Sequence, residues 1–190
     1  MNNRKKIGII KNKVLTRIII FLGGKMISLI LAAGKGTRMK SERSKVVHEV
    51  NGVPMVKMVS KLLKNAGIEK SIYILGHRME EVLNTIGEVE YVEQVEQLGT
   101  GHAVLIAKEK IEENKDDVLI TYGDTPLLRK ETINRMKDKF HNENLDCIIL
   151  SCNMKDPFAY GRIIKKDGNV VDIIEEKEAT EEQKKIKEVN

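Results

Sequence analysis

Two glycines and several cations follow an apolar run near residue 30. Residues 28–33 read Ser-Leu-Ile-Leu-Ala-Ala, and Gly34, Gly36 and Arg38 come directly after them. Such a run is typical of a buried parallel strand. Glycines let a backbone approach a ligand closely, while Arg38 offers a planar fork and Lys45 a mobile point charge for phosphate oxygens. The pattern predicts a polyphosphate site, although the loop can also be an ordinary turn and Lys45 a solvated surface lysine.

Two further polar segments follow apolar runs. Residues 97–102 read Gln-Leu-Gly-Thr-Gly-His before a helical pattern, so Thr100 can cap that helix or its free N–H groups can face a ligand. We expect His102 to be structural rather than catalytic. Asp124 can cap a turn, or it can hold Mg²⁺, which takes one or two carboxylates plus substrate phosphates. Because open parallel sheets bind ligands beyond the carboxyl ends of their strands, we expect the three segments to converge on one crevice.

Strand and helix patterns alternate along the chain, which predicts an α/β fold with a mostly parallel sheet and helices on both of its faces. Strands are expected at residues 28–31, 71–75, 89–94, 117–122 and 146–153, and helices at 54–65, 79–86, 101–113 and 130–141. Beyond residue 154 the pattern changes to two short strands around Asp167-Gly168, a hairpin signal. A capping box then begins at Thr180, and no apolar strand is expected between it and Asn190.

The positive charge of the chain is concentrated at its start. Residues 1–25 hold seven cations and no acid, so the formal net charge of +5 less +7 leaves −2 for residues 26–190. A basic surface for nucleic acid is therefore not supported. An aromatic content of 4% without tryptophan also argues against a base-stacking platform. We predict no nucleic-acid partner.

The basic start contains an apolar patch at residues 18–22. The patch is too short to span a membrane and short for a signal peptide, so no membrane partner is predicted. We expect the domain to begin near Met26, with residues 1–25 as a basic extension outside the fold. Cys147 and Cys152 share one apolar run. On one strand they would lie about 16 Å apart on opposite faces, too far to be bridged, which suits the cytoplasm.

Taken together, the motifs resemble the sugar-nucleotide pyrophosphorylases, nucleotidyltransferases with a Rossmann-like (GT-A-like) fold. The similarity is greatest to the uridyltransferase domain of the bacterial bifunctional N-acetylglucosamine-1-phosphate uridyltransferases/glucosamine-1-phosphate acetyltransferases. It is carried by residues 31–39, 96–103, 122–127, 160–163 and 174–190, in the order of that family. Ser44 departs from the family pattern, which has a proline at this position.

The resemblance implies a role for particular residues. The nucleotide would be bound by Leu31, Ala32, Ala33, Gly34, Gln94, Gly99 and Thr100. Arg38 and Lys45 would be catalytic, because they would neutralise the triphosphate and its transition state. Asp124 would hold Mg²⁺. The sugar and substrate side would be bound by Tyr122, Gly123, Gly161, Glu175 and Asn190.

The implied reaction joins UTP and N-acetylglucosamine 1-phosphate into UDP-N-acetylglucosamine and pyrophosphate. It would proceed by Mg²⁺-assisted direct displacement, in the cytoplasm, for cell-wall precursor synthesis. The family continues past the position of Asn190, so residues 26–190 are expected to be a partial domain, incomplete at the C-terminus and without the β-helix acetyltransferase domain. Two alternatives stay open. The chain can be a related sugar-phosphate nucleotidyltransferase, or a fragment that binds nucleotide without turnover.

Overall fold

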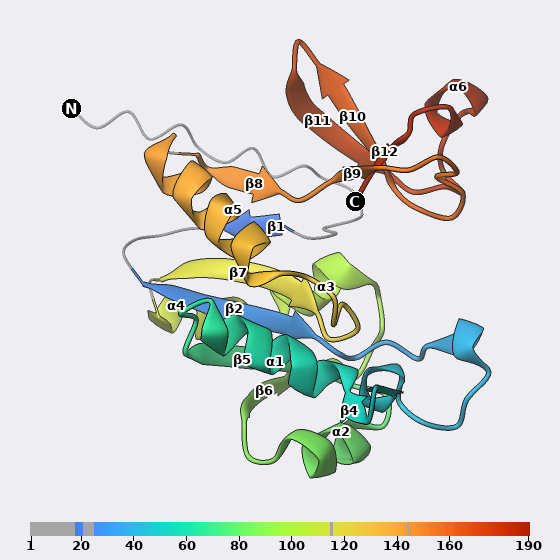
Figure 1. Ribbon diagram of the computed structural model, residues 1–190. Coiled ribbons are helices and arrows are strands. Elements are labelled where there is room, and N and C mark those ends of the chain that lie inside the picture. The colour runs from blue at the N-terminus through green and yellow to red at the C-terminus, as the bar shows by residue number, and fades with distance from the viewer. Residues whose placement is uncertain (1–17, 21–24, 115, 144) are drawn as a thin grey trace.

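A six-stranded sheet forms the centre of the protein (Figure 1). The computed structural model describes residues 18–20, 25–114, 116–143 and 145–190. The strand order is β6-β5-β2-β7-β1-β8. The strands are β1 (Ile18–Ile20), β2 (Met26–Leu31), β5 (Lys70–Leu75), β6 (Glu90–Glu93), β7 (Asp117–Tyr122) and β8 (Cys147–Ile149). Strands β2, β5, β6 and β7 are parallel to their neighbours in this group, whereas β1 is antiparallel to both β7 and β8.

The central strands are buried on both faces, as their continuous apolar sequences predict. Successive side chains of a strand point to opposite faces. In β2, Leu29 packs into one apolar cluster and Ile30 into the other. The register places Leu29 beside Ile72 of β5 and Ile120 of β7. Each face of the sheet therefore carries its own apolar layer.

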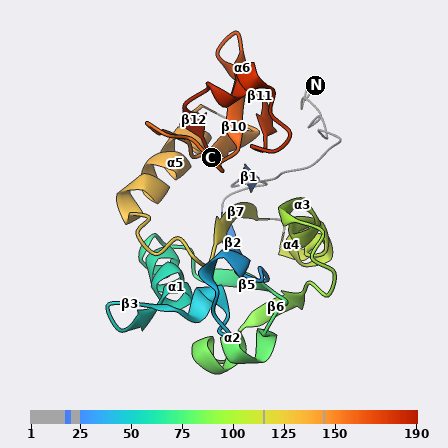
Figure 2. The same cartoon turned by 90° about the vertical axis from the view of Figure 1, so that its right-hand side faces the viewer.

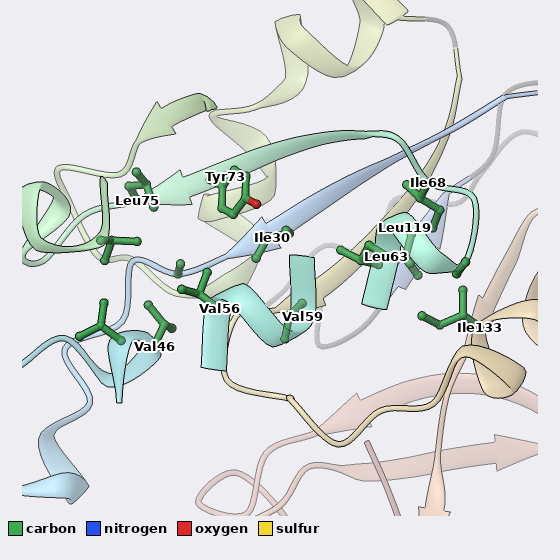
Figure 3. Close-up of a cluster of buried hydrophobic side chains, with 14 of the residues drawn as sticks. Ile30, Val46, Val56, Val59, Leu63, Ile68, Tyr73, Leu75, Leu119 and Ile133 are labelled. Atoms are coloured by element: carbon green, nitrogen blue, oxygen red, sulfur yellow. The ribbon is translucent and has the colours of Figure 1, made fainter. Parts of the chain in front are cut away.

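Helices cover both faces of the sheet, as Figure 2 shows. The face that carries Ile30 packs against α1 (Met55–Asn65), α2 (Met79–Ile86) and α5 (Lys130–Asn142). Figure 3 shows this cluster, with Val56, Val59 and Leu63 of α1 directed at the strands. The opposite face packs against α3 (Thr100–Leu105) and α4 (Lys108–Asn114). The predicted layered α/β fold is confirmed.

A smaller antiparallel sheet follows in the sequence, in the order β11-β10-β12-β9 (Figure 1). Its strands are β9 (Cys152–Asn153), β10 (Arg162–Lys166), β11 (Asn169–Ile174) and β12 (Glu188–Val189), with α6 (Glu181–Lys184) before β12. Asp167 and Gly168 both have positive φ in the turn of the predicted hairpin. The predicted capping box at Thr180 is also present. A two-stranded ribbon, β3 (Glu49–Val50) and β4 (Val53–Pro54), and two short 3₁₀ turns, η1 (Thr37–Met39) and η2 (Lys45–Val47), complete the described elements.

Arg162 anchors the small sheet from inside. Its side chain is 2% exposed and its Nη2 pairs with Glu176 Oε2 over 2.6 Å. The same guanidinium donates to the carbonyls of Tyr160 and Lys184. A buried guanidinium has to be paired and hydrogen-bonded. These contacts therefore tie β10 to the segments on either side of it.

Several predicted elements differ from the structure. The helix expected at 101–113 is two helices, because the chain tightens into a turn in which Ala107 N–H donates to Val104 O. The strand expected at 146–153 is β8 and β9, which belong to different sheets. Cys147 and Cys152 therefore do not share a strand; both are exposed and no disulfide joins them. A short last strand, β12, pairs with β9 and β10 where none was expected.

The basic start of the chain contributes to the main sheet. Ile19 pairs with Leu119 of β7 on one side and with Ile148 of β8 on the other. For Ile18–Ile20 the expectation of an extension outside the fold is therefore wrong, because these residues fill the place between two strands that do not pair with each other. The rest of that expectation, for residues 1–17 and 21–24, lies outside the described residues. No helix among the described residues has the length and apolar character needed to cross a membrane.

We predict that Ile19→Pro destabilises the protein. Proline has no backbone N–H, so in a strand with a partner on each side it removes a ladder hydrogen bond. A loss of about 1 kcal/mol lowers Tm by about 2–4 °C in a domain of this size, and we expect at least that shift in a thermal melt. Ile19→Val is the matched control because it keeps the backbone. Equal melting temperatures for the two variants would contradict the pairing of β1.

Candidate nucleotide site at the strand ends

A cavity of about 350 Å³ opens at the carboxyl ends of three parallel strands. Leu31 ends β2, Gln94 follows β6 and Tyr122 ends β7, and all three line the cavity. After β2 the chain adds β5 and β6 on one side, and then returns to place β7 on the other side of β2. The reversal leaves a crevice between neighbouring strand ends, where open α/β sheets bind their ligands.

Most of the residues expected at the nucleotide, the phosphates and the metal line this cavity, and so does Tyr122, which was expected on the sugar and substrate side. They are Leu31, Ala32, Ala33, Gly34, Lys45, Gln94, Gly99, Thr100, Tyr122 and Asp124. Six further residues line the cavity without a predicted contact to nucleotide, sugar or metal: Gly36, which was named only as a glycine of the loop, and Thr37, Met39, Val46, Gln97 and Ala103. Five of these belong to the same two motifs, so membership of the motifs was a signal that could have found them. Val46 had no such signal.

Two glycines allow the loops around the cavity to approach one another. Gly36 has φ +61°, and a Cβ there would lie 2.8 Å from the Cβ of Lys45. A Cβ on Gly76 would lie 2.8 Å from the carbonyl oxygen of Gln94 and 3.0 Å from the Cβ of Ala33. Any side chain at either position would push these loops apart. The glycines therefore set the spacing of the loops that line the cavity.

The backbone of Gly34 has more space beside it than the backbone of Gly36. A Cβ on Gly34 would meet nothing within 4 Å, so the packing around it does not require glycine. The open space beside its backbone remains accessible to a ligand. Arg38 lies within η1, but its side chain lies outside the described part of the chain.

An ion pair joins Lys45 and Asp124, the charged side chains among the described residues that line the cavity. Lys45 Nζ contacts Asp124 Oδ2, and the two side chains are 35% and 21% exposed. Lys45 comes from η2 and Asp124 follows β7, so the pair connects the loop after β2 with the end of β7. Both groups keep access to solvent. A phosphate can therefore compete for the ammonium group, and a cation can compete for the carboxylate.

The residue before Lys45 is held by helix α2. Ser44 N–H donates to Glu81 Oε2 over 2.7 Å, and Arg43 Nε lies 3.3 Å from Glu81 Oε1. The hydrogen bond from the Ser44 amide lowers the pKa of the Glu81 carboxyl below its usual range, and the Arg43 guanidinium lowers it further. Because this segment leads into Lys45, α2 sets the position of the lysine.

The side chain of Gln94 contacts the loop that leads into α3. The residue is 5% exposed, and its Nε2 donates to the carbonyl oxygen of Gly99 over 3.1 Å. His102 Nδ1 lies 3.1 Å from the same nitrogen. Gly99 is the N-cap of α3 and has φ +98°. Thr100 is therefore the first residue of the helix, and the suggestion from the sequence that Thr100 caps the helix is wrong. Only backbone geometry caps this end, because no side-chain hydrogen bond is present there.

Three of the residues expected on the sugar and substrate side lie apart from those that line the cavity. Gly161 precedes β10 and Glu175 follows β11, at the end where Arg162 pairs with Ile174. Asn190 N–H donates to Gly161 O over 3.4 Å. The small sheet thus brings Gly161, Glu175 and Asn190 together, but none of them is among the described residues that line the cavity.

Gly123, also expected at the sugar, packs beneath the cavity and not in its wall. Its N–H donates to Leu31 O over 2.9 Å, and a Cβ there would lie 3.1 Å from Val46 Cγ1. The close packing holds the end of β7 against the end of β2. It therefore fixes where the neighbouring residues Tyr122 and Asp124 reach the cavity.

The protein ligands available to a metal are few. Within the described ranges, no three His, Cys, Asp or Glu side chains are grouped so that they could hold a metal ion by themselves. Asp124 supplies one carboxylate at the cavity. Mg²⁺ is commonly held by one or two carboxylates together with substrate phosphates. The donor set fits a metal that arrives with a phosphate ligand and not a metal enclosed by protein.

Comparison with known protein families identifies the family of this chain. The sequence profile of the MobA-like NTP transferase domain matches residues 28–183. The chain belongs to this family. The match begins in β2 and includes every segment that lines the cavity.

Individual relatives extend this assignment. "Bifunctional protein GlmU" of Caldanaerobacter subterraneus subsp. tengcongensis is 48% identical over 167 residues, which are 87% of this chain and 36% of that protein. Relatives of the same name in three other bacteria are 41–46% identical. The chain thus spans about a third of the length of the curated relatives that it matches. The resemblance to the bifunctional uridyltransferase family is confirmed.

Solved structures confirm the fold. A putative glucose-1-phosphate thymidylyltransferase from Bacillus anthracis superposes with a TM-score of 0.71 at 21% identity, covering 86% of this chain and 68% of that one. A Mycobacterium tuberculosis protein, solved in complex with manganese, superposes with a TM-score of 0.50 at 19% identity, covering 61% of this chain and 59% of that one.

The contact between Ser44 and Glu81 predicts acid sensitivity. A carboxylate whose pKa is lowered by folding contributes stability above its unfolded pKa of about 4.3, and this contribution is lost as the pH falls through the folded pKa. We expect Glu81→Gln to lower Tm at pH 7 and to lower it much less at pH 3. Thermal melts at the two pH values measure this difference.

The neighbouring helix residue supplies the control for that prediction. Glu80 is exposed in the same first turn of α2, so Glu80→Gln removes the same charge without touching Ser44. An equal effect of Glu81→Gln at both pH values, or an equal effect of the two variants, would contradict the assigned contact.

Proposed function

We propose that this chain binds UTP and N-acetylglucosamine 1-phosphate and makes UDP-N-acetylglucosamine and pyrophosphate. The observation that carries the proposal is the cavity at the strand ends, where the glycine loop, the pair of Lys45 and Asp124, and the segment around Gln94 meet. Membership of an NTP transferase family and the similarity to proteins named GlmU support the choice of this reaction.

The proposed step is a direct displacement. A phosphate oxygen of the sugar phosphate attacks the α-phosphorus of UTP, and the bond from that phosphorus to the bridging oxygen breaks as pyrophosphate leaves. Such transfers depend on positioning and charge neutralisation more than on proton transfer. Lys45, at the cavity wall, and Arg38, in the glycine loop, are assigned to the phosphates. The backbone of residues 31–34 and the Gln94–Gly99–Thr100 group are assigned to the uridine.

Asp124 is assigned to the metal, which we propose to be Mg²⁺. When bound, the ion would neutralise charge on the phosphates. A Lys45 ammonium that turns from Asp124 to a phosphate leaves the carboxylate available for the cation. Both partners of the ion pair are thus used in the reaction. The manganese in one structural relative supports a divalent cation in this fold.

Gly161, Glu175 and Asn190 are assigned to the N-acetylglucosamine part, with Tyr122 and Gly123 beside the metal. The small sheet holds the first three at one end of the β10–β11 hairpin. In this assignment the sugar lies between that end of the small sheet and the cavity. We place the reaction in the cytoplasm, with no nucleic acid or membrane as a partner.

Two other functions are tested by the same assay. The similarity in fold to a thymidylyltransferase makes a related sugar-phosphate nucleotidyltransferase the second candidate. The third is nucleotide binding without turnover, because the chain spans about a third of its curated relatives. Pyrophosphate release is measured with UTP, CTP, GTP and dTTP, each with N-acetylglucosamine 1-phosphate or glucose 1-phosphate. Release with UTP and N-acetylglucosamine 1-phosphate supports the proposal, and release with another pair supports the second candidate.

Replacing either member of the ion pair should abolish most of the turnover. We expect Lys45→Ala and Asp124→Asn each to lower kcat by about 100-fold or more, the scale seen when one stabilising group is removed from a transition state. Lys61→Ala, on the exposed side of α1, is the control for loss of a lysine. Turnover that is unchanged in Lys45→Ala would remove its assigned role. Binding of UTP without turnover in the wild-type chain would favour the third candidate.

A further inference from the structure

The orientation of the Gln94 side-chain amide is fixed by its neighbours. Its nitrogen lies 3.1 Å from the carbonyl oxygen of Gly99 and 3.1 Å from Nδ1 of His102. A carbonyl oxygen can only accept a hydrogen bond, so the NH₂ end of the amide has to face Gly99. With the second N–H directed at His102, both donors of the amide are used inside the protein.

The same geometry fixes the proton of His102. An amide nitrogen donates and does not accept, so Nδ1 has to be the acceptor. The imidazole is then neutral and carries its proton on Nε2. His102 lies in α3, three residues after the N-cap Gly99, so one turn of chain supplies both acceptors. A side chain without an acceptor at this point would leave one amide N–H of Gln94 unpaired in a buried place.

The oxygen of the amide is what remains for a ligand. No described residue hydrogen-bonds to Gln94 Oε1, and Gln94 lines the cavity. A fixed acceptor suits a ring N–H, such as the N3–H of uracil or thymine. Cytosine has a lone pair at N3, which would face a second acceptor. A rotated amide would offer NH₂ to the base and lose this distinction.

We propose that His102 is a positioning residue for base selectivity, because it accepts the second N–H of Gln94 and so, together with the Gly99 carbonyl, keeps the amide oxygen toward the base. This inference rests on the proposed function, since it assigns the base of the nucleotide to the cavity. It goes beyond it in giving a role to a histidine that is not among the described residues lining the cavity. It also explains how a glutamine, which can present either end of its amide, presents only one here.

Two substitutions separate this role from simple packing. His102→Leu removes the acceptor but keeps an apolar side chain on α3. His102→Asn keeps an acceptor oxygen near the position of Nδ1. Binding of UMP and CMP to the whole chain is measured by calorimetry, which does not depend on turnover. We expect the preference for UMP over CMP to fall about tenfold in His102→Leu, the effect of one lost neutral hydrogen bond, and to be restored in His102→Asn.

Three results would overturn the proposal. One is an unchanged preference in a folded His102→Leu. Another is an equal loss of preference in His102→Leu and His102→Asn, which would show that α3 packing alone matters. The third needs no variant: ¹⁵N NMR of the wild-type chain with labelled histidine should show Nε2 protonated in His102, and protonated Nδ1 would contradict the geometry. Tight binding of UMP with no pyrophosphate release would instead count against the proposed reaction and leave the role of His102 in place.

Discussion

The pairing of β2 with strands on both of its sides is the constraint on which the other features depend. Its register with β5 and β7 places Leu31 beside Ile74 and Tyr122. The ends of these strands are therefore level, and the segments that follow them leave the sheet at one edge. Both faces of β2 are buried under helices, so a shift by one residue would exchange its two apolar layers. The position of the cavity follows from this register.

Close backbone approach turns that edge into a site. Gly36, Gly76 and Gly123 each lie where a Cβ would press on a neighbouring loop or strand end. The loops they carry bring Lys45 to Asp124. None of these contacts involves a large apolar area, so they add little to stability compared with the core. Their effect is to define distances between groups that act on a ligand.

The sequence predicted the parts of the fold that depend on local patterns. The apolar runs of β2, β5 and β7, the Asp167-Gly168 turn and the capping box at Thr180 have a period or a turn chemistry that a single segment reveals. Their order implied a parallel sheet, and a parallel sheet implied convergence at its carboxyl edge. Ten of the expected site residues line the cavity for this reason.

The other features depend on partners far away in the sequence. Ile18–Ile20 is a strand because β7 and β8 accept it, and Cys147 and Cys152 are separated because their strands pair with β1 and β12. No local pattern carries such information. The Gly161 and Asn190 contact likewise needs the pairing of β10 with β12.

Hydrogen-bond direction is hidden from the sequence in the same way, although it matters most for chemistry. The motif that contains Gly99 and His102 suggests a helix start, but it does not state that both residues accept from Gln94, the residue that directly follows β6. One amide with two donors and two protein acceptors has a single orientation. Lys45 and Asp124 are also partners of each other, but both side chains are partly exposed, so a ligand phosphate or a cation can replace either partner. In this site a ligand therefore meets two kinds of group: an amide oxygen that the protein leaves without a partner among the described residues, and an ion pair whose members can exchange partners.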